Sequence, residues 1–383
     1  MPFFGPPFRE VFINRLTFKK EKIKLTAIDL FSGGGGLSLG LEKAGFDVLL
    51  GVELRKEIAK TYVVNHPYAK VLTKDIRKVT GKEILELVGK QKIDLIAGCP
   101  PCQGFSQLTE KWKRKDPRNG LVLEMARIIE EIKPRMVMME NVPGLAMKGK
   151  RILNKFIRKL ESLGYIVQKG VLQMADYGVP QSRRRLVLLA GMGFGISMPK
   201  ATHVRNGNKK NKLKPWVPIS RVISKTGRPM KFSCASRDKG PESYNWHVVG
   251  DLKDVSRQRL KAMQEGADRR ALPKHLRPDC HRDDNEGFTN VYGRMRWNDV
   301  SPTITSGCTR PCMGRFGHPD KLRTISVREA ALIQTFPKNY KIKTKFMDYA
   351  CDIVGNALPP KFARAAGEIC VDAYENFEEV ENG

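Results

Sequence analysis

The chain has 383 residues, 69 Lys+Arg against 40 Asp+Glu, a formal net charge of +29, and 41% hydrophobic residues. That length and apolar share predict one large or two medium folded domains, and they exclude an intrinsically disordered chain and a small disulfide-stapled scaffold. The excess charge favours a polyanionic partner through counterion release, with a merely very soluble surface as the alternative, and residues 101–290 hold +21 of it.

The sequence also indicates where the protein works. Its longest apolar runs are too short to span a membrane, and prolines and charges in MPFFGPPFREVFINR interrupt the apolar run that a secretory signal needs. We therefore expect a cytoplasmic protein with no membrane partner. The eight cysteines are not expected to form disulfides there, and a Cys99-x-x-Cys102 pair with only Cys308-x-x-x-Cys312 as a second half does not predict a metal site.

The first 190 residues alternate short apolar strands with amphipathic helices. Strands are expected at 25–31, 48–53, 71–76, 93–98 and 135–140, with two more near 166–173 and 185–190; helices are expected at 37–46, 55–66, 81–90 and 120–133. This alternation predicts an α/β fold with a doubly wound, mostly parallel sheet that helices cover on both faces.

From about residue 195 the pattern changes. Residues 195–290 are rich in Lys, Asn, Arg, Pro and Ser, and we expect a second, smaller and loop-rich domain there. Helices return at 326–336, with Ser326 as the cap, and at 359–377, with proline in the first turn. The predicted division is therefore an N-terminal extension (1–23), a large α/β domain (24–194), the loop-rich domain (195–290) and a C-terminal part that returns to the α/β domain (291–383).

The first candidate site is the glycine turn in IDLFSGGGGLSLGLEKAGF, residues 28–46. Asp29 lies near the end of a strand, and glycines between that strand and the next helix let the backbone approach a ligand closely. The spacing does not match the dinucleotide fingerprint G-x-G-x-x-G, because the third glycine would fall at Ser38 or Leu39. An ordinary glycine turn remains the alternative for Gly33, Gly35 and Gly36.

Two acidic residues follow the neighbouring strands. Glu53 ends the second strand, where an acidic side chain can accept hydrogen bonds from a ribose. Asp75 lies near the end of the third strand and is placed to meet an adenine edge. Ordinary surface acids are the alternative interpretation of both.

The second candidate site is GCPPCQGFS, residues 98–106, directly after the fourth strand. Pro100 and Pro101 hold the chain extended before Cys102, whose thiol is thereby presented as a nucleophile. A buried structural cysteine is the alternative, but a strongly basic loop beside the thiol argues against core packing. The cations of that loop are Lys111, Lys113, Arg114, Lys115 and Arg118.

Two further motifs complete the set. Glu140 of ENVPG ends the fifth strand, next to the strand that leads to Cys102, where a carboxyl can act as a general acid. A helix cap or an ion-pair partner is the alternative interpretation of this carboxyl. YGVPQSRRRLVLLAG sends Arg183 and Arg185 to one face of a strand and Arg184 to the other, because side chains alternate.

In this order and spacing, the motifs DLFSGGGG, PPCQGFS, ENVPG, YGVPQSRRR, SVREAALIQTFP and IVGNALPP resemble those of the DNA cytosine-5 methyltransferases. The likeness covers about residues 24–192 and 290–373. It implies the class I S-adenosylmethionine-dependent methyltransferase fold, S-adenosylmethionine as methyl donor, double-stranded DNA as substrate, and residues 195–290 as a target-recognition domain.

The resemblance also implies roles for individual residues. Cys102 looks like the nucleophile that attacks carbon 6 of cytosine, and Glu140 would bond ring nitrogen 3 and the exocyclic amine. Arg185, with Arg183 as its same-face neighbour, would hold the pyrimidine carbonyl. The implied cofactor residues, of which Phe31 would stack on the adenine, are Asp29, Phe31, Gly33, Gly35, Gly36, Glu53, Asp75, Ile76, Pro101 and Asn356.

Because the target carbon is stacked inside duplex DNA, the base must be flipped out. The basic flap 107–119 is the candidate for closing over the DNA, and base readout is assigned to residues 195–290. The implied DNA contacts near the nucleophile are Gln103, Ser106, Lys111, Lys113, Arg114, Lys115 and Arg118.

Departures from the family pattern are small: GNAL replaces GNSV or GNAV, a fourth glycine extends the turn, and Lys74 precedes Asp75 where glycine is frequent. We expect a monomeric, nucleoid-associated modification or solitary methylase of prokaryotic type, with a possible partner endonuclease. One alternative is the branch that methylates transfer RNA, whose Cys-Phe-Thr signature is missing here. Another is a catalytically idle DNA-binding protein, against which Cys102, Glu140 and Arg185 argue.

Overall fold

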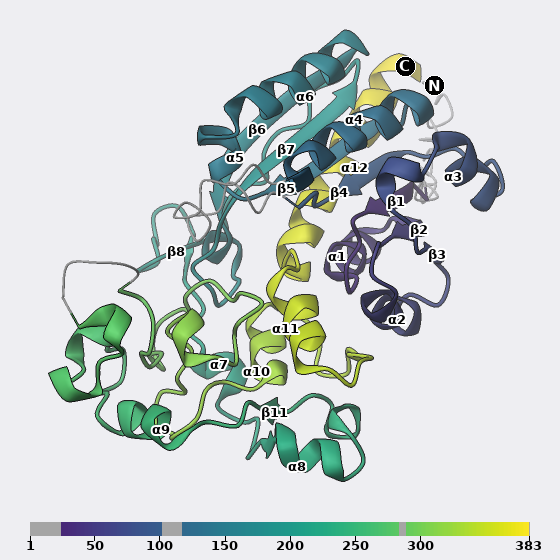
Figure 1. Ribbon diagram of the computed structural model, residues 1–383. Helices are drawn as coiled ribbons and strands as arrows, with labels where there is room; N and C mark the ends of the chain where they lie inside the picture. Colours follow the sequence, from purple (N-terminus) through teal and green to yellow (C-terminus); the bar gives the residue numbers. More distant parts are fainter. Residues whose placement is uncertain (1–23, 102–116, 283–288, 383) are drawn as a thin grey trace, which may run out of the picture.

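The computed structural model describes residues 24–101, 117–282 and 289–382, with side chains except at 117, 118, 381 and 382. The chain forms two lobes, of which the upper one in Figure 1 is built around a sheet and the lower one around short helices and loops. The C-terminal helix runs from the region between the lobes along the sheet (Figure 1).

The sheet has seven strands in the order β3-β2-β1-β4-β5-β7-β6. The first five are parallel, whereas β7 pairs antiparallel with both β5 and β6. This confirms the predicted doubly wound, mostly parallel sheet. The strands are β1 (Thr26–Leu30), β2 (Asp47–Val52), β3 (Lys70–Leu72), β4 (Leu95–Gly98), β5 (Met136–Asn141), β6 (Tyr165–Gln173) and β7 (Arg184–Met192).

The third strand is shorter than predicted. It ends at Leu72, and Asp75 instead caps the 3-10 turn η1 (Ile76–Lys78) by accepting a hydrogen bond from the Arg77 backbone N–H. Short polar side chains favour such capping over strand pairing, because they bond the backbone locally. Asp75 therefore lies on a connection beyond the strand.

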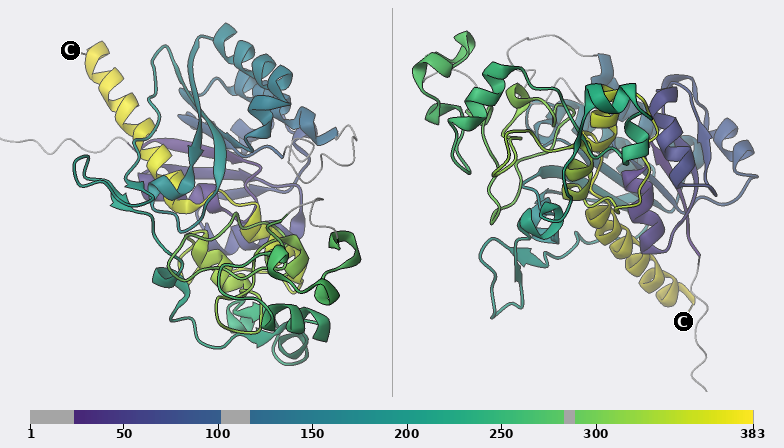
Figure 2. Two further views of the ribbon diagram at one scale, coloured as in Figure 1. Left: turned by 90° about the vertical axis from the view of Figure 1, so that its left-hand side faces the viewer. Right: turned by 90° about the horizontal axis from the view of Figure 1, so that it is seen from below.

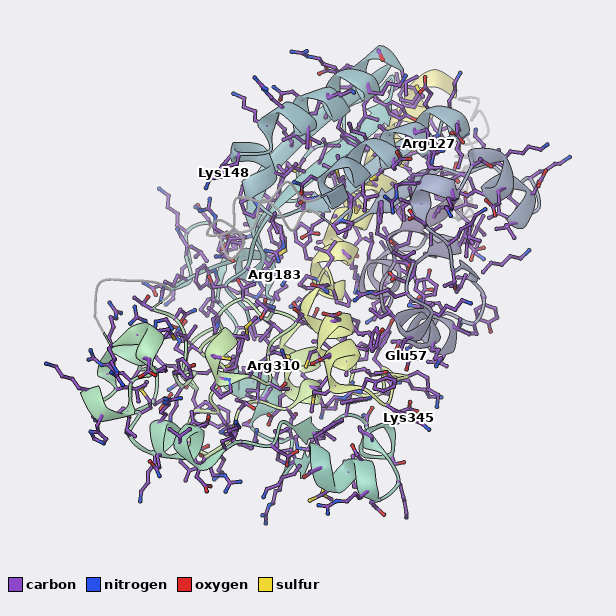
Figure 3. All side chains as sticks on the ribbon, viewed as in Figure 1. Glu57, Arg127, Lys148, Arg183, Arg310 and Lys345 are labelled. Carbon is purple, nitrogen blue, oxygen red and sulfur yellow. The ribbon has the colours of Figure 1, made fainter. Side chains whose placement is uncertain are left out.

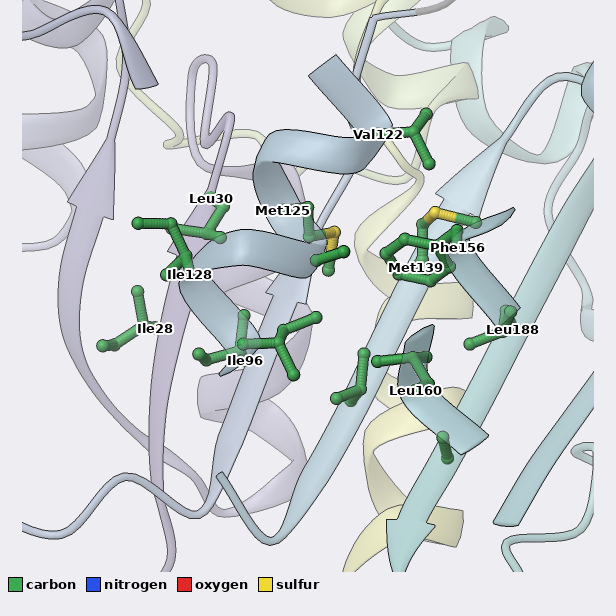
Figure 4. Packing of buried hydrophobic residues seen from close by; sticks show 14 of the residues in the cluster. Ile28, Leu30, Ile96, Val122, Met125, Ile128, Met139, Phe156, Leu160 and Leu188 are labelled. Carbon is green, nitrogen blue, oxygen red and sulfur yellow. The ribbon is translucent and has the colours of Figure 1, made fainter. Parts of the chain in front are cut away.

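Helices cover both faces of the sheet. On one face α4 (Leu121–Ile132) and α6 (Lys150–Ser162) press apolar side chains onto β1, β4 and β5, as Figure 4 shows for Met125, Ile128 and Phe156. The buried residues of α4 recur three and four positions apart, the spacing of one helix face. The other face is covered by α1 (Gly36–Ala44) and α12 (Pro360–Asn382).

The remaining helices of the upper lobe are α2 (Lys56–Asn65), α3 (Gly81–Leu87), α5 (Gly144–Met147), η4 (Pro117–Gly120) and η5 (Met174–Tyr177). None of the helices in the three described stretches has the length and apolar character needed to cross a membrane.

The smaller lobe has a core of its own. Buried Trp246 and Val248 meet Phe316, Ile333 and Val354, so this core joins residues from both sides of position 290. The predicted domain boundaries stay a prediction. Its elements are β8 (His203–Val204), β9 (Lys214–Pro215), α7 (Ser220–Ile223), β10 (Met230–Lys231), α8 (Phe232–Arg237), η6 (Pro241–Tyr244), β11 (Val248–Val249), α9 (Asp254–Lys261), η7 (Arg269–Ala271), η8 (Lys274–Leu276), η9 (Asp279–His281), η10 (Pro311–Met313), α10 (Val327–Ile333) and α11 (Met347–Gly355).

Two local predictions about helix starts are confirmed. Ser326 accepts a hydrogen bond from the Glu329 backbone N–H at 3.0 Å, and the Glu329 carboxylate accepts one from the Ser326 N–H at 2.7 Å. This reciprocal capping box begins α10. The C-terminal helix begins at Pro360, where a missing N–H leaves no helical bond unmade.

Candidate active site

The motifs singled out in the sequence meet at the carboxyl edge of the sheet. Phe31, Glu53 and Cys99 follow β1, β2 and β4, and Glu140 lies at the end of β5. Because β7 is antiparallel, its first residues, Arg184 and Arg185, lie at the same edge. Ligands of open α/β sheets bind at this edge.

In the glycine turn, only one of the predicted glycines lies beside open space. Gly33 has φ +55°, and a Cβ there would meet nothing within 4 Å. Its N–H donates to Glu53 Oε2 at 3.1 Å, which ties the turn to the end of β2. This geometry leaves room for a ligand to approach the backbone of Gly33.

The following glycines are required by contacts within the protein. A Cβ on Gly35, whose φ is +90°, would lie 2.2 Å from His66 Nε2, and one on Gly36 would lie 2.7 Å from the Leu358 carbonyl oxygen. The residue that follows α2 and the segment before α12 therefore approach these two glycines closely, and the predicted contact of Gly35 and Gly36 with a cofactor stays a prediction. Sequence spacing could not reveal this, because His66 and Leu358 are distant along the chain.

Beneath the turn lies a buried hydrogen-bond chain that the sequence analysis missed. The Ser38 hydroxyl donates to Asp29 Oδ2 at 2.6 Å, and its oxygen is 2.8 Å from the Tyr62 hydroxyl. Burial raises the pKa of Asp29 to about 7, and the bond from Ser38 only partly opposes that rise. Ser38 occupies a position where a dinucleotide fingerprint would carry glycine, and its polar side chain was the available signal.

The polar groups around the turn fit a hydrogen-bonding ligand. Among the described residues, the buried oxygens Asp29 Oδ1 and Ser32 Oγ have no hydrogen-bond partner. Phe31 has a left-handed φ of +64°, a strained conformation that such sites often carry. Within the described residues, the nearly buried Glu53 carboxylate accepts two backbone N–H groups, from Gly33 and Arg55, and the Arg55 Nε lies 3.6 Å from its Oε1. It therefore has acceptor capacity left for ligand hydroxyls.

The other predicted cofactor residues are distributed around this edge. The Arg77 guanidinium, 2.5 Å from Asp75 Oδ2, lowers the pKa of that carboxyl, and Ile76 is buried beside it. Pro101 is half-buried, and Asn356 is exposed at the end of α11. Their contacts with a cofactor stay predictions.

Glu140 of β5 and Arg185 of β7 form an ion pair at this edge of the sheet. Arg185 Nε lies 2.7 Å from Glu140 Oε1, and Arg185 Nη1 donates to the Arg184 carbonyl at 2.8 Å. Burial lowers the pKa of Arg185, and the Glu140 carboxylate opposes that shift. Arg184 is exposed while Arg183 is buried, which confirms the predicted alternation.

Arg183 lies deeper, toward the smaller lobe (Figure 3). Its Nη1 donates to the carbonyls of Ile304 at 2.9 Å and Gly355 at 3.2 Å, and burial lowers its pKa to about 9. These bonds tie β7 to the loop before Cys308 and to α11. The predicted contact of Arg183 with substrate stays a prediction.

A buried amide pair strengthens this junction. Gln181 donates to Gln334 Oε1 at 2.6 Å and accepts from the Ile304 N–H at 2.8 Å, while Gln334 donates to the Val354 carbonyl at 2.7 Å. The sequence analysis did not assign these residues. Glutamines inside the otherwise apolar segments before β7 and after α10 were the signal that could have found them.

The Pro-Cys segment is anchored beside Glu140. Asn141 donates from Nδ2 to the Pro100 carbonyl at 2.9 Å, so the end of β5 holds the chain just before Cys102. Burial and the nearby Glu140 carboxylate raise the pKa of the Cys99 thiol well above its usual range. Cys102 lies outside the described residues, and so do the predicted DNA contacts Gln103, Ser106, Lys111, Lys113, Arg114 and Lys115. The side chain of Arg118, the last predicted DNA contact, also lies outside them.

Other proteins are similar to this sequence over most of its length. The Type II methylase M.HgiDII of Herpetosiphon aurantiacus is 36% identical over 345 residues, which cover 88% of this chain and 92% of the relative. The Type II methyltransferase M1.BsuMI of Bacillus subtilis is 32% identical over 367 residues, covering 91% and 81%.

Solved structures share the fold. A protein encoded in an E. coli prophage and described as a DNA modification methyltransferase aligns with a TM-score of 0.68 at 23% identity, over 92% of this chain and all of that chain. The Dnmt2 methyltransferase of S. pombe aligns with a TM-score of 0.61 at 17% identity, over 92% and 99%. The profile of the C-5 cytosine-specific DNA methylases matches residues 25–372. This chain therefore belongs to that family and is a DNA cytosine methyltransferase.

Proposed function

We propose that the enzyme transfers a methyl group from S-adenosylmethionine to carbon 5 of a cytosine flipped out of double-stranded DNA, through a covalent adduct of Cys102. The observation that carries this proposal is the buried Glu140–Arg185 pair, at 2.7 Å, beside the anchored Pro100. A pyrimidine presented to Cys102 would therefore meet a carboxyl group and a guanidinium at the same edge.

The reaction begins with the Cys102 thiolate forming a bond to carbon 6. The electron pair of the 5,6 double bond then moves toward carbon 5 and into the ring, where negative charge develops. Glu140 stabilises that charge by holding a proton at ring nitrogen 3 and accepting from the exocyclic amine. Arg185 would hold the carbonyl oxygen of the pyrimidine through Nη2, since its ion pair with Glu140 and its bond to the Arg184 carbonyl use Nε and Nη1 in the described part of the chain.

S-adenosylmethionine, when bound, supplies a methyl group on a positively charged sulfur. Glu53, Gly33 and Phe31 would hold its nucleoside part, since Gly33 faces open space, its N–H is bonded to Glu53, and Phe31 begins the turn. Once carbon 5 carries both the methyl group and its original proton, a base removes that proton. The electron pair released re-forms the double bond, and the Cys102 thiolate leaves.

Cys99 does not suit this role. Its thiol would be almost wholly protonated near neutral pH, because burial and the Glu140 carboxylate both disfavour the thiolate. Of the cysteines in the C-x-x-C pair, Cys102 is therefore the proposed nucleophile. The cationic segment that follows it, residues 107–119, is proposed to contact phosphates and close over the DNA.

The deciding experiment compares Cys102→Ser with the matched control Cys234→Ser, an exposed cysteine of the smaller lobe. We expect Cys102→Ser to lose methyl transfer while keeping DNA binding, and Cys234→Ser to keep both. Bisulfite sequencing of DNA from expressing cells reports the target sequence at the same time. Methylation by Cys102→Ser at the wild-type rate would refute the nucleophile.

A second experiment tests the adduct itself. DNA carrying 5-fluorocytosine at the target should form a stable covalent complex with the wild-type enzyme, because fluorine at carbon 5 cannot leave as a proton. Failure to trap on DNA that is otherwise methylated would contradict the covalent route. Methylation of transfer RNA but not of DNA would favour the RNA-acting alternative.

A further inference from the structure

A second strongly basic segment lies away from the motifs. Residues 200–214, here called the basic loop, contain six cations and no Asp or Glu: Lys200, Arg205, Lys209, Lys210, Lys212 and Lys214. They contribute about a fifth of the net charge of +29 from 15 of the 383 residues. No residue of the catalytic proposal lies in this loop.

The basic loop is an ordered element of the fold. Its ends pair through β8 and β9, and backbone bonds of 2.8 and 2.9 Å join Asn208 to Leu213 across its tip. Asn208 Oδ1 also accepts from the Asn211 N–H at 3.2 Å, and Lys212 takes a left-handed φ of +55°. A non-glycine residue adopts that strained region only where its surroundings impose it. The tip therefore fixes the backbone positions from which the lysines project.

The charge of the loop is not neutralised by the protein. Its five lysines form no ion pair with any described residue, and Arg205 alone has one, to Asp299 Oδ2 at 3.4 Å. All five lysines are exposed. At the base of the loop the pKa of His203 is lowered, mainly by burial and further by the neighbouring cations Lys361 and Lys214.

An open hollow of about 350 Å³ adjoins the base of the loop. Its carboxylates are already engaged, because Glu265 accepts from the Trp297 N–H and Asp299 accepts from Arg205 and the Val300 N–H. The donors and the aromatic ring that line it are Arg205, Asn206, Trp216, Arg296 and Asn298.

The position of the loop separates it from the catalytic edge. In both views of Figure 2 it projects on the side where the C-terminal part of α12 emerges, and α4 lies on the opposite side. In the chain, α4 follows the Pro-Cys-Gln segment through η4. A duplex bound at the catalytic edge would therefore leave the basic loop free, and the base readout expected of residues 195–290 would fall to other parts of that segment.

We infer that the basic loop and the adjoining hollow bind the phosphate backbone of a second stretch of duplex DNA, separate from the one that presents the target cytosine. Uncompensated lysines at defined positions, with arginine and amide donors behind them, suit a sequence-independent phosphate contact. Such a second site would let the enzyme hold one segment while it samples another. The inference rests on the proposed function only in taking DNA as the partner.

The test counts duplexes bound by the full chain. Sedimentation with a duplex of about 12 base pairs, roughly 40 Å long at about 3.4 Å per pair, should show two duplexes per wild-type molecule at low salt. Replacing Lys209, Lys210 and Lys212 with Gln should leave one. In variants that replace only one of these lysines, the slope of log affinity against log salt at the second site should become less steep by about 0.9 for the phosphate contact removed.

The matched control makes the same change in net charge on α6, whose Arg151, Lys155 and Arg158 are also exposed. The variant with these three replaced by Gln should still bind two duplexes. The inference would be overturned if the wild type bound one duplex or the loop variant bound two. It would also be overturned if the α6 variant lost its second duplex, or if the loop preferred single-stranded RNA. Methylation is scored in parallel, so failure of the proposed chemistry is seen separately.

Discussion

The buried carboxyl of Asp29 should make the stability of the enzyme depend on pH. Its side chain is completely buried, and burial raises its pKa from 3.8 to about 7. Between those two values the folded chain holds a proton that the unfolded chain releases. The resulting stabilisation is fully present below 3.8 and is lost as the pH rises through about 7.

The size of the effect follows from the shift. Each pH unit within that window changes the free energy of unfolding by about 1.4 kcal/mol. In Asp29→Asn the carboxamide occupies the same space and does not titrate. From about pH 5 to about pH 8.5 the wild type should therefore lose roughly 2.7 kcal/mol relative to this variant.

Urea unfolding of both proteins across this pH range measures the difference directly, since other titrating groups contribute equally to both. Ser38→Ala provides a second check: it removes the bond that favours the ionised carboxyl, so the transition should move to higher pH. Parallel stability curves for the wild type and Asp29→Asn would show that the carboxyl is already ionised in the folded protein at pH 5, and would refute the reasoning.

Three further substitutions test other parts of the structure. Gly36→Ala places a Cβ 2.7 Å from the Leu358 carbonyl oxygen, and should lower the free energy of unfolding by about 1–3 kcal/mol in urea titrations; an unchanged midpoint would contradict that contact. Asn141→Ala frees the Pro100 carbonyl and should reduce kcat about 100-fold with little change in the KM for S-adenosylmethionine, whereas a selective rise in KM would argue against a role in placing Cys102. Arg294→Met removes a buried donor from the Leu260 carbonyl at the end of α9 and from the carbonyls of His318 and Lys321. It should lower the free energy of unfolding by roughly 3–5 kcal/mol in thermal unfolding; a loss below about 1 kcal/mol would contradict a role in joining these segments.

Local signals in the chain were sufficient for the fold class. Alternation of apolar strands with amphipathic helices predicted the parallel sheet, because burial on both faces demands that pattern. Helix starts at Ser326 and Pro360 were equally predictable, since a cap or a missing N–H acts within a few residues. The boundary of β3 was wrong, because Asp75 bonds its own turn instead of continuing the strand.

The order of the motifs, read together, predicted the family that the comparisons then showed. It did not reveal what most of the motif residues contact. Arg183 bonds Ile304 and Gly355, which are 121 and 172 residues away in sequence. A Cβ on Gly35 would collide with His66, a contact that the motif did not predict.

The net charge of +29 predicted the kind of partner but not where on the molecule the charge lies. Composition predicted a polyanionic partner but treated the central cations as one surface. The tertiary structure divides them, because the basic loop projects on the side opposite α4 (Figure 2). The sequence by itself determined the fold class, the helix starts at Ser326 and Pro360, and the family, because these signals depend on neighbours along the chain. The packing of the sheet and the two lobes decided which side chains meet and which side of the molecule each charge faces. Those contacts join residues far apart in the sequence, and separation along the chain does not predict distance in space.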